Sequence, residues 1–361
     1  MTQATLSSSN QKQQAPAWWR QHGGLLIVLL LMGLLPFIVA LLDGQSFASL
    51  VANETGNSRF IQGLMIEVFI LAIYAISYDL ILGITGLLSF GHAMFFAAGA
   101  YYTGIAFKSL EYGLGQTLIG LVVVAVVQAL IVGLVLPRVK GVTFALVTLG
   151  VASMFSIVVQ SSELAEWTGA DVGLQGITPP EFLNTSTERL RLYFLTLACT
   201  LFIYLIYKRF VDSPTGRVCI AIRENENRAL MLGYNTFYFK MAALVLSSLT
   251  AAFAGFLHAI HQPIVSPNIA SLGWTVAALL IILMGGVGTL SGALIGAAIF
   301  RLLEYFLDKQ FGDKASFLLG LMYVGLVLFV PYGIVGTWRA KAFQIEQGRK
   351  RLVRLLGLSK E

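Results

Sequence analysis

The sequence predicts an all-α fold, a polytopic transmembrane helical bundle, from three observations. The mean hydropathy of the 361-residue chain is +0.78, and 57% of its residues are hydrophobic while only 12% are charged, about half the charge of a soluble domain. Apolar runs of roughly 20 residues, the length of a helix that crosses a bilayer, recur along the chain. The alternating segments of about ten residues that build a membrane barrel do not occur in it. The bilayer is therefore the expected solvent of this chain.

The first predicted elements are a polar tail and a membrane anchor. Residues 1–22 are rich in Gln and Ser, a composition that predicts a disordered tail, with Trp18 and Trp19 at the membrane interface. The apolar run over residues 24–42 contains Pro36. A cleaved signal peptide is the alternative interpretation, but this run exceeds the usual apolar core of about 7 to 15 residues, and no A-x-A site follows it. We therefore expect an anchor.

The later apolar runs bring the prediction to about ten spans. Residues 274–300 are too many for one span, and we divide them at the sequence GGVGTLSG. Gly288, Gly292 and Gly296 recur there every four residues and predict a ridge for helix packing. Eight spans are the alternative if the Gly-rich pieces are re-entrant. Besides the divided run, the predicted spans after the anchor are residues 60–82, 83–107, 114–136, 143–160, 192–207, 241–261 and 316–335.

Glycines interrupt the third span, in the sequence GITGLLSFGHAMFF. Gly83, Gly86 and Gly91 are expected to loosen the helix at membrane depth, where loosened backbone must be buried in protein or face a cavity. The alternative is that these glycines only permit close helix packing and that His92 is an interior histidine with satisfied hydrogen bonds. The candidate pore-lining residues are Ser89, Phe90 and His92.

Two acidic residues fall within a predicted span. Charge at membrane depth is costly, so Glu67 and Asp79 should face protein or water. We expect Glu67 to bond a neighbouring polar group. Asp79 lies near the end of its predicted span, and we expect it at the membrane interface.

The longest polar and charge-dense segment between the two apolar halves of the chain covers residues 211–240. With ten spans and the N-terminus inside, most of the 24 Lys and Arg residues lie on the cytoplasmic side, as the positive-inside rule requires. Segment 211–240 and both termini are then cytoplasmic. The chain divides into a disordered tail, 1–22, a transmembrane domain, 23–337, and a basic tail, 338–361.

Segment 211–240 also contains the start and stop signals of a short helix. Ser213 precedes Pro214 as an N-cap precedes proline at the first helical position, and Gly233 is placed as a C-cap glycine. Such an amphipathic helix suits docking into a partner's groove. The alternative is a solvated loop whose charges only set the topology. The predicted apolar stripe consists of Ala221, Ile222, Ala229, Leu230 and Leu232.

Three strings carry a resemblance to a known family. They are YDLILGITGLLSFGHAMFFAAGAYY, SPTGRVCIAIRENENRALMLGYNTFYFKMAAL and ILMGGVGTLSGALIGA. They resemble, in the same order, the branched-chain amino acid ABC permease family, in its LivM-like branch, and the resemblance covers most of residues 60–336. It implies that segment 211–240 is a cytoplasmic coupling helix, although Arg228, Leu230 and Met231 depart from the small or acidic residues usual in the family. The candidate ATPase-coupling residues are Arg217, Arg223, Glu224, Glu226, Arg228, Ala229 and Gly233.

The same resemblance implies an assembly in the bacterial inner (plasma) membrane. This permease would work with a second permease of its superfamily, two ATP-binding cassette ATPases and an extracytoplasmic solute-binding protein, taking up branched-chain or related hydrophobic amino acids. The chain lacks a G-x-x-x-x-G-K-[ST] loop, so ATP is expected on the partner subunits and no cofactor on this chain. Urea or short amides are the alternative solutes. A stand-alone secondary transporter is the alternative class.

Motifs for chemistry on a substrate are missing from the sequence. It contains neither H-E-x-x-H nor G-x-S-x-G. Cys199 and Cys219 are too few and too differently placed for a metal site or a disulfide framework. The pI near 9.3 reflects basic residues beside apolar runs, where they orient the chain in a membrane. We predict no enzymatic activity, no catalytic or metal-binding residue, and lipid rather than nucleic acid as a partner.

Overall fold

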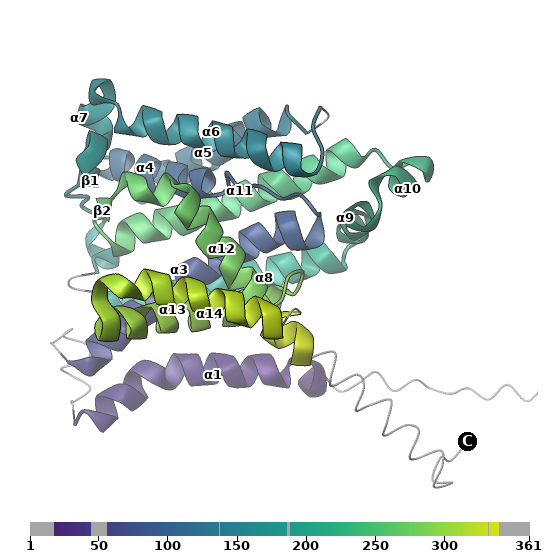
Figure 1. The fold of residues 1–361 in the computed structure, drawn as a ribbon. Helices are drawn as coiled ribbons and strands as arrows, with labels where there is room; N and C mark the ends of the chain where they lie inside the picture. Colours follow the sequence, from purple (N-terminus) through teal and green to yellow (C-terminus); the bar gives the residue numbers. More distant parts are fainter. Residues whose placement is uncertain (1–17, 45–55, 137, 186–187, 331, 339–361) are drawn as a thin grey trace, which may run out of the picture. The chain divides into compact units, whose positions relative to one another are not determined.

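The computed structural model describes residues 18–44, 56–136, 138–185, 188–330 and 332–338. Across these residues the chain is almost wholly helical, with one two-stranded sheet (Figure 1). The chain forms two compact units, residues 1–61 and residues 62–361.

The first unit contains helix α1, Trp18–Leu42, which covers the predicted anchor and includes Pro36. The carbonyl of Pro36 accepts a 3.0 Å hydrogen bond from the hydroxyl of Ser58. Ser58 is buried in the first turn of α3, Asn57–Asp79. The predicted tails lie outside the described residues up to residue 17 and from residue 339.

The centre of the second unit is α11, Thr236–His261, which packs against α4, Ala93–Lys108, and α5, Leu114–Gly133. Small residues allow α4 and α11 to approach closely. A Cβ atom on Gly255 would lie 2.0 Å from the carbonyl oxygen of Phe96, so this contact requires glycine. Close approach through small residues is a common way for helices to associate in a membrane.

The predicted interruption by glycine is confirmed. Helix α3 continues as a π-helical segment, Leu80–Ile84, and residues 86–89 lie outside any helix or turn before α4 begins. The irregular backbone finds partners on neighbouring helices. The Thr148 hydroxyl accepts from the Phe90 amide at 3.2 Å, and the Thr275 hydroxyl accepts from the Ala93 amide at 2.9 Å. Non-helical backbone can persist at membrane depth because its polar groups are paired in this way.

The predicted division of residues 274–300 is also confirmed, because α12, Leu272–Gly285, ends before α13, Leu290–Phe311, begins. The glycine ridge packs as expected at its later positions. A Cβ on Gly296 would lie 2.1 Å from the Ile281 carbonyl, and one on Gly292 would lie 2.8 Å from the carbonyl of Gly285. Gly288 lies in the turn before α13, with a φ of +74°, and so does not belong to the helical ridge.

Six helical segments of the described chain are long and apolar enough to cross a membrane. The number of spans near ten therefore stays a prediction. The six segments are Asn57–Ile84, Leu114–Gly133, Val142–Gln160, Arg189–Asp212, Thr236–His261 and Leu290–Leu326. The α-helices and strands not yet named are α6, Val142–Gln160, α7, Ala165–Thr168, β1, Leu174–Gln175, α8, Arg189–Asp212, α9, Pro214–Glu224, α10, Glu226–Met231, β2, Ile264–Val265, and α14, Ala315–Phe329.

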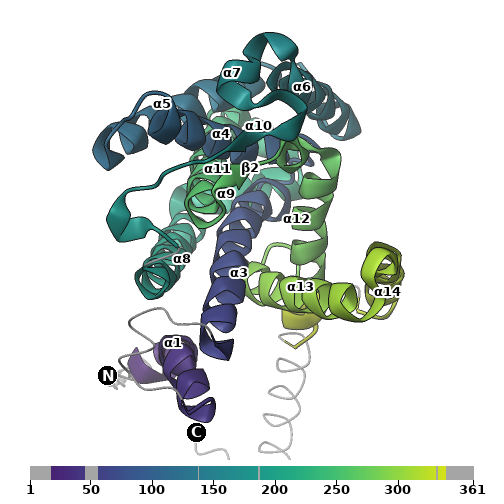
Figure 2. The same ribbon diagram turned by 90° about the vertical axis from the view of Figure 1, so that its left-hand side faces the viewer.

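The second unit has two distinct ends (Figures 1 and 2). One end carries α7 and the antiparallel pair of β1 and β2, in which Leu174 opposes Val265. The opposite end carries α9 and α10. Segment 211–240, which the charge count places in the cytoplasm, thus lies at the opposite end of this unit from α7 and the sheet.

Candidate coupling segment and membrane cavity

Helix α9 starts as the sequence predicts. The Ser213 hydroxyl accepts a 3.2 Å hydrogen bond from the amide of Gly216, and Pro214 occupies the first helical position. Gly216 has no room for a side chain, since its Cβ would lie 2.3 Å from the carbonyl of Phe210. A tight turn therefore connects α8 to α9, and Ser213 caps the first turn of α9.

The single helix predicted up to Gly233 is wrong, because Asn225 divides it in two. Asn225 has an extended backbone with a φ of −162°, and its side-chain oxygen accepts from the Arg228 amide at 2.9 Å. This bond starts α10 as a new helix, since a short polar side chain competes with the helical hydrogen bonds of the backbone. Gly233 ends α10 as expected, with a φ of +87°.

This division changes the predicted apolar stripe. Ile222 and Ala229 are buried as expected, but Ala221 is exposed. Leu230 and Leu232 were expected in the same stripe, yet they are 46% and 71% exposed. Met231 between them is 88% exposed. These three residues form an exposed apolar tip on α10, which we call the α10 tip, and a patch of this kind on a protein surface is typical of a contact site.

The candidate charged residues divide between solvent and the protein. Arg217 and Arg228 are exposed. Glu226 instead faces α11, where it accepts from Lys240 at 2.5 Å and from Thr236 at 3.0 Å. Burial opposes the ionisation of Glu226, but the hydrogen bond and charge of Lys240 dominate and lower the pKa of Glu226 below its ordinary value. Glu226 therefore ties α10 to α11.

Arg223 points from α9 to the interrupted helix. Its guanidinium donates to the Gly83 carbonyl and pairs with Glu224 at 3.1 Å. A Cβ on Gly86 would lie 2.7 Å from the Arg223 side chain, so the glycine makes space for the arginine. Arg223 is exposed as well as in contact with the π-helical segment, and its role in ATPase coupling stays a prediction.

A second polar contact extends this connection. The Asp79 carboxylate accepts a 2.7 Å hydrogen bond from the amide of Gly288, in the turn between α12 and α13. Asp79 is fully buried, so it faces protein as expected, and its place at the membrane interface stays a prediction. The start of the π-helical segment is thereby joined to the α12–α13 turn. In the sequence, only the glycines of the strings around Gly83 and Gly288 indicated that these two segments approach closely.

The candidate pore-lining residues lie in the packed interior or next to it. Ser89 and His92 are buried, and Phe90 is half-buried. The His92 Nε2 atom lies 2.8 Å from the Ser77 hydroxyl, and the ring stacks on Tyr74 at 5.4 Å between centroids. A role of these residues in a transport pathway stays a prediction.

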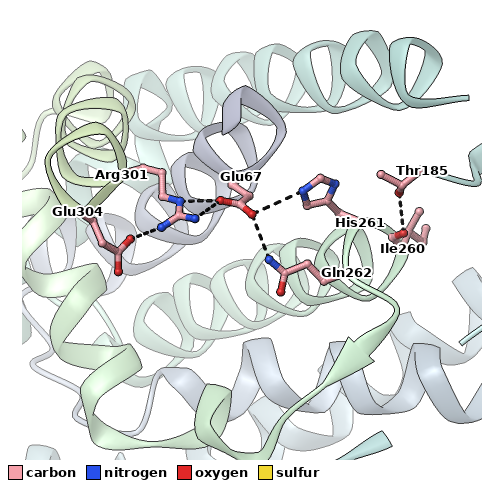
Figure 3. A network of polar contacts seen from close by, with 7 residues as sticks. All are labelled: Glu67, Thr185, Ile260, His261, Gln262, Arg301 and Glu304. Carbon is pink, nitrogen blue, oxygen red and sulfur yellow. Dashed lines mark hydrogen bonds and ion pairs between the residues drawn. The ribbon is translucent and has the colours of Figure 1, made fainter. Parts of the chain in front are cut away.

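Glu67 has the polar partners that its burial requires, as predicted (Figure 3). Arg301 donates to Glu67 through Nε at 2.6 Å and also through Nη2. Gln262 donates to the other Glu67 oxygen at 3.1 Å, and the His261 ring lies 3.7 Å from that oxygen. A second bond of Arg301 reaches Glu304 at 2.6 Å.

This cluster borders a cavity of about 620 Å³ within the second unit. The cavity walls come from α3, α4, α11, α12, α13 and α14. Sequence reasoning missed the cavity because no single run contains it. The described residues hold no group of three or more His, Cys, Asp and Glu that could bind a metal ion.

Comparisons with known proteins agree with one another. A family model described as "Branched-chain amino acid transport system / permease component" matches residues 60–330. The high-affinity branched-chain amino acid transport system permease protein LivM of Escherichia coli (strain K12) is 29% identical over 295 residues, which cover 74% of this chain and 68% of the relative. LivH of the same strain and BraD of Pseudomonas aeruginosa, named as permease proteins of such systems, are each 25% identical over 73% of this chain and 91% of their own. No solved structure matches the chain.

Proposed function

The chain belongs to the family of branched-chain amino acid transport system permease components, and from that premise we propose that it is a membrane permease subunit of an ATP-driven importer. With a second permease of the same superfamily it forms the pathway for solute in the bacterial inner membrane. Two ATPase subunits bind the ATP, and an extracytoplasmic binding protein delivers the solute. The permease itself is a multi-pass membrane protein and not an enzyme.

One observation carries the coupling part of this proposal. The α10 tip exposes apolar side chains beside charged ones at one end of the second unit, and α9 joins it to the interrupted helix through Arg223 and Gly83. An apolar tip on a short helix fits a groove on a partner. We assign that groove to the ATPases, which places segment 211–240 in the cytoplasm.

The proposed mechanism moves this segment as one piece. Closure of the ATPases on ATP displaces α10 and α9, and Arg223 passes the displacement to the π-helical segment at Leu80–Ile84. Asp79 and Gly288 pass it to the turn between α12 and α13. Alternating access follows if these segments rearrange between two discrete packings.

Branched-chain amino acids are the proposed solutes, on the names that the relatives carry. The test is uptake of labelled leucine into proteoliposomes that hold the complete complex and the binding protein. Uptake that requires ATP supports the proposal. Gradient-driven uptake by this chain alone would instead make it a secondary transporter, and uptake of urea without leucine would replace the proposed solute.

A further inference from the structure

A buried lysine lies where α10 meets α11. Lys240 is only 6% exposed, and its ammonium group donates to the Glu226 carboxylate at 2.5 Å. Lysine is seldom buried unless its charge is paired. The dehydration of a buried ion pair can cost as much as the pairing returns, so stability alone does not explain this pair. What the pair holds in place is α10.

The direction of α10 depends on these contacts. Asn225 interrupts the helical backbone between α9 and α10, so the direction of α10 does not follow from that of α9. The residue of α10 that the protein buries is Ala229, and its single methyl group provides little apolar contact. Glu226, the first residue of α10, also accepts a 3.0 Å hydrogen bond from Thr236 on α11. The contacts of Glu226 with α11 therefore set the direction of α10 and of the α10 tip.

Helix α11 extends from the end of the second unit that carries α10 to the end that carries the sheet (Figure 1). It packs along α4 and α5. In its middle, the Ser247 hydroxyl donates to the Ser77 carbonyl on α3 at 2.6 Å, and both serines are fully buried. Ser77 lies shortly before the π-helical segment Leu80–Ile84. A displacement of α11 at Lys240 would therefore reach the helices around the interruption.

We propose that Lys240 is a positioning residue for the coupling of ATP hydrolysis to transport. Its ammonium group fastens α10 to α11, so that a displacement of the α10 tip by the ATPases moves α11. Segment 211–240 then acts on the membrane helices at two points. One is the π-helical segment, which Arg223 contacts, and the other is α11, which Glu226 contacts through Lys240. This inference rests on the proposed function and adds to it a residue outside the candidate coupling residues.

A second lysine beside the same carboxylate provides a matched control. Lys140 lies just before α6, its ammonium group is 3.7 Å from the other oxygen of Glu226, and its side chain is 60% exposed. Lys240→Met and Lys140→Met therefore remove the same charge from two sides of Glu226. Only the first substitution removes the buried contact with α11.

The assay compares leucine uptake with ATP hydrolysis in proteoliposomes that hold the complete complex and the binding protein. We expect Lys240→Met to lower the number of leucine molecules transported per ATP by about fivefold, the change in an equilibrium when a contact of about 1 kcal/mol is lost. Lys140→Met should keep this ratio within about twofold, because an exposed ion pair contributes little. Equal ratios in the two variants overturn the proposal.

A double variant separates positioning from stability. Lys240→Met alone leaves the partly buried Glu226 without its closest cation, whereas Glu226→Gln combined with Lys240→Met leaves no charge unpaired. Replacing both members of a buried ion pair is often neutral for stability, so we expect the double variant to recover the Tm of the unsubstituted complex. Its ratio of transport to hydrolysis should stay low, because α10 is still unfastened from α11. Recovery of the ratio together with the Tm overturns the proposal and leaves the pair a purely structural role.

Glu226→Gln alone decides the question if the double variant does not assemble. It keeps the shape of the side chain and an oxygen that accepts from Lys240, and it removes only the charge. We expect the ratio to fall about threefold, because a hydrogen bond to an uncharged oxygen is roughly half as strong as one to a carboxylate. A ratio equal to that of Lys140→Met overturns the proposal. If the unsubstituted complex shows no ATP-dependent uptake of leucine, the proposed function itself fails.

Discussion

Arg223→Ala should uncouple ATP hydrolysis from transport without dismantling the complex. Arg223 connects α9 to the interrupted helix through the carbonyl of Gly83. Its removal leaves that carbonyl without its charged donor and empties the space beside Gly86. The contact between the coupling segment and the membrane helices would then loosen.

The size of this effect follows from the contact. A hydrogen bond to a charged group contributes about 1.5 to 3 kcal/mol. The Arg223 side chain is 39% exposed, so solvent screens part of this energy, and we take about 1 to 2 kcal/mol. Such a loss changes an equilibrium by a factor of about 5 to 30. We expect the number of leucine molecules transported per ATP hydrolysed to fall by that order.

The assay measures uptake and ATP hydrolysis in the same proteoliposomes. Arg209→Ala is the matched control, because Arg209 lies exposed near the end of α8, outside the candidate coupling residues, and the substitution removes the same charge. We expect that control to keep the ratio of transport to hydrolysis. The reasoning is refuted if Arg223→Ala lowers this ratio no more than Arg209→Ala does.

Three further predictions concern packing, docking and pH. Gly83→Ala should prevent stable folding, because the new Cβ would lie 2.5 Å from the Gly288 amide, whereas Gly150→Ala on α6 meets nothing within 4 Å and should leave Tm unchanged in a thermal melt. Met231→Asp places a charge on the α10 tip and should lower the amount of ATPase that copurifies with the permease; undiminished copurification contradicts the docking role. The pKa of Glu226 is lowered from an ordinary 4.5, so the stability that it contributes is present above that pH and is lost as the pH falls through the lowered pKa. Tm should therefore fall with acid less steeply in Glu226→Gln than in the unsubstituted protein, and parallel curves would count against this ion pair.

The sequence was sufficient to predict the structure where residues close together in the chain determine it. Glycine spacing predicted the interruption after α3 and the division between α12 and α13, since glycine weakens a helix wherever it occurs. Ser213 followed by Pro214 predicted the start of α9. The need of Glu67 for a polar partner followed from the cost of charge in a membrane.

The sequence was insufficient where two distant segments meet. Nothing local to Glu67 names Arg301, which lies 234 positions later. The division of the predicted helix at Asn225 could not be predicted for a different reason. A short polar side chain inside a helical pattern can either point to solvent or cap a new helix. Arg223 was a candidate on the family resemblance, which named no contact for it, and only the packing of α9 on the π-helical segment shows that its head group reaches Gly83.

Helix α3 connects the cavity to the π-helical segment that Arg223 contacts. Glu67 on this helix borders the cavity, and Asp79 at its end contacts the α12–α13 turn beside the segment that Arg223 holds. The two acids are about 18 Å apart along the axis, at roughly 1.5 Å per residue. The most apolar stretch of this helix with its π-helical extension is 94% buried, so α3 is held on all sides by packed neighbours and moves with them. Since packed elements shift between discrete arrangements rather than deform gradually, a displacement at Gly83 would reach the pairing of Glu67 with Arg301.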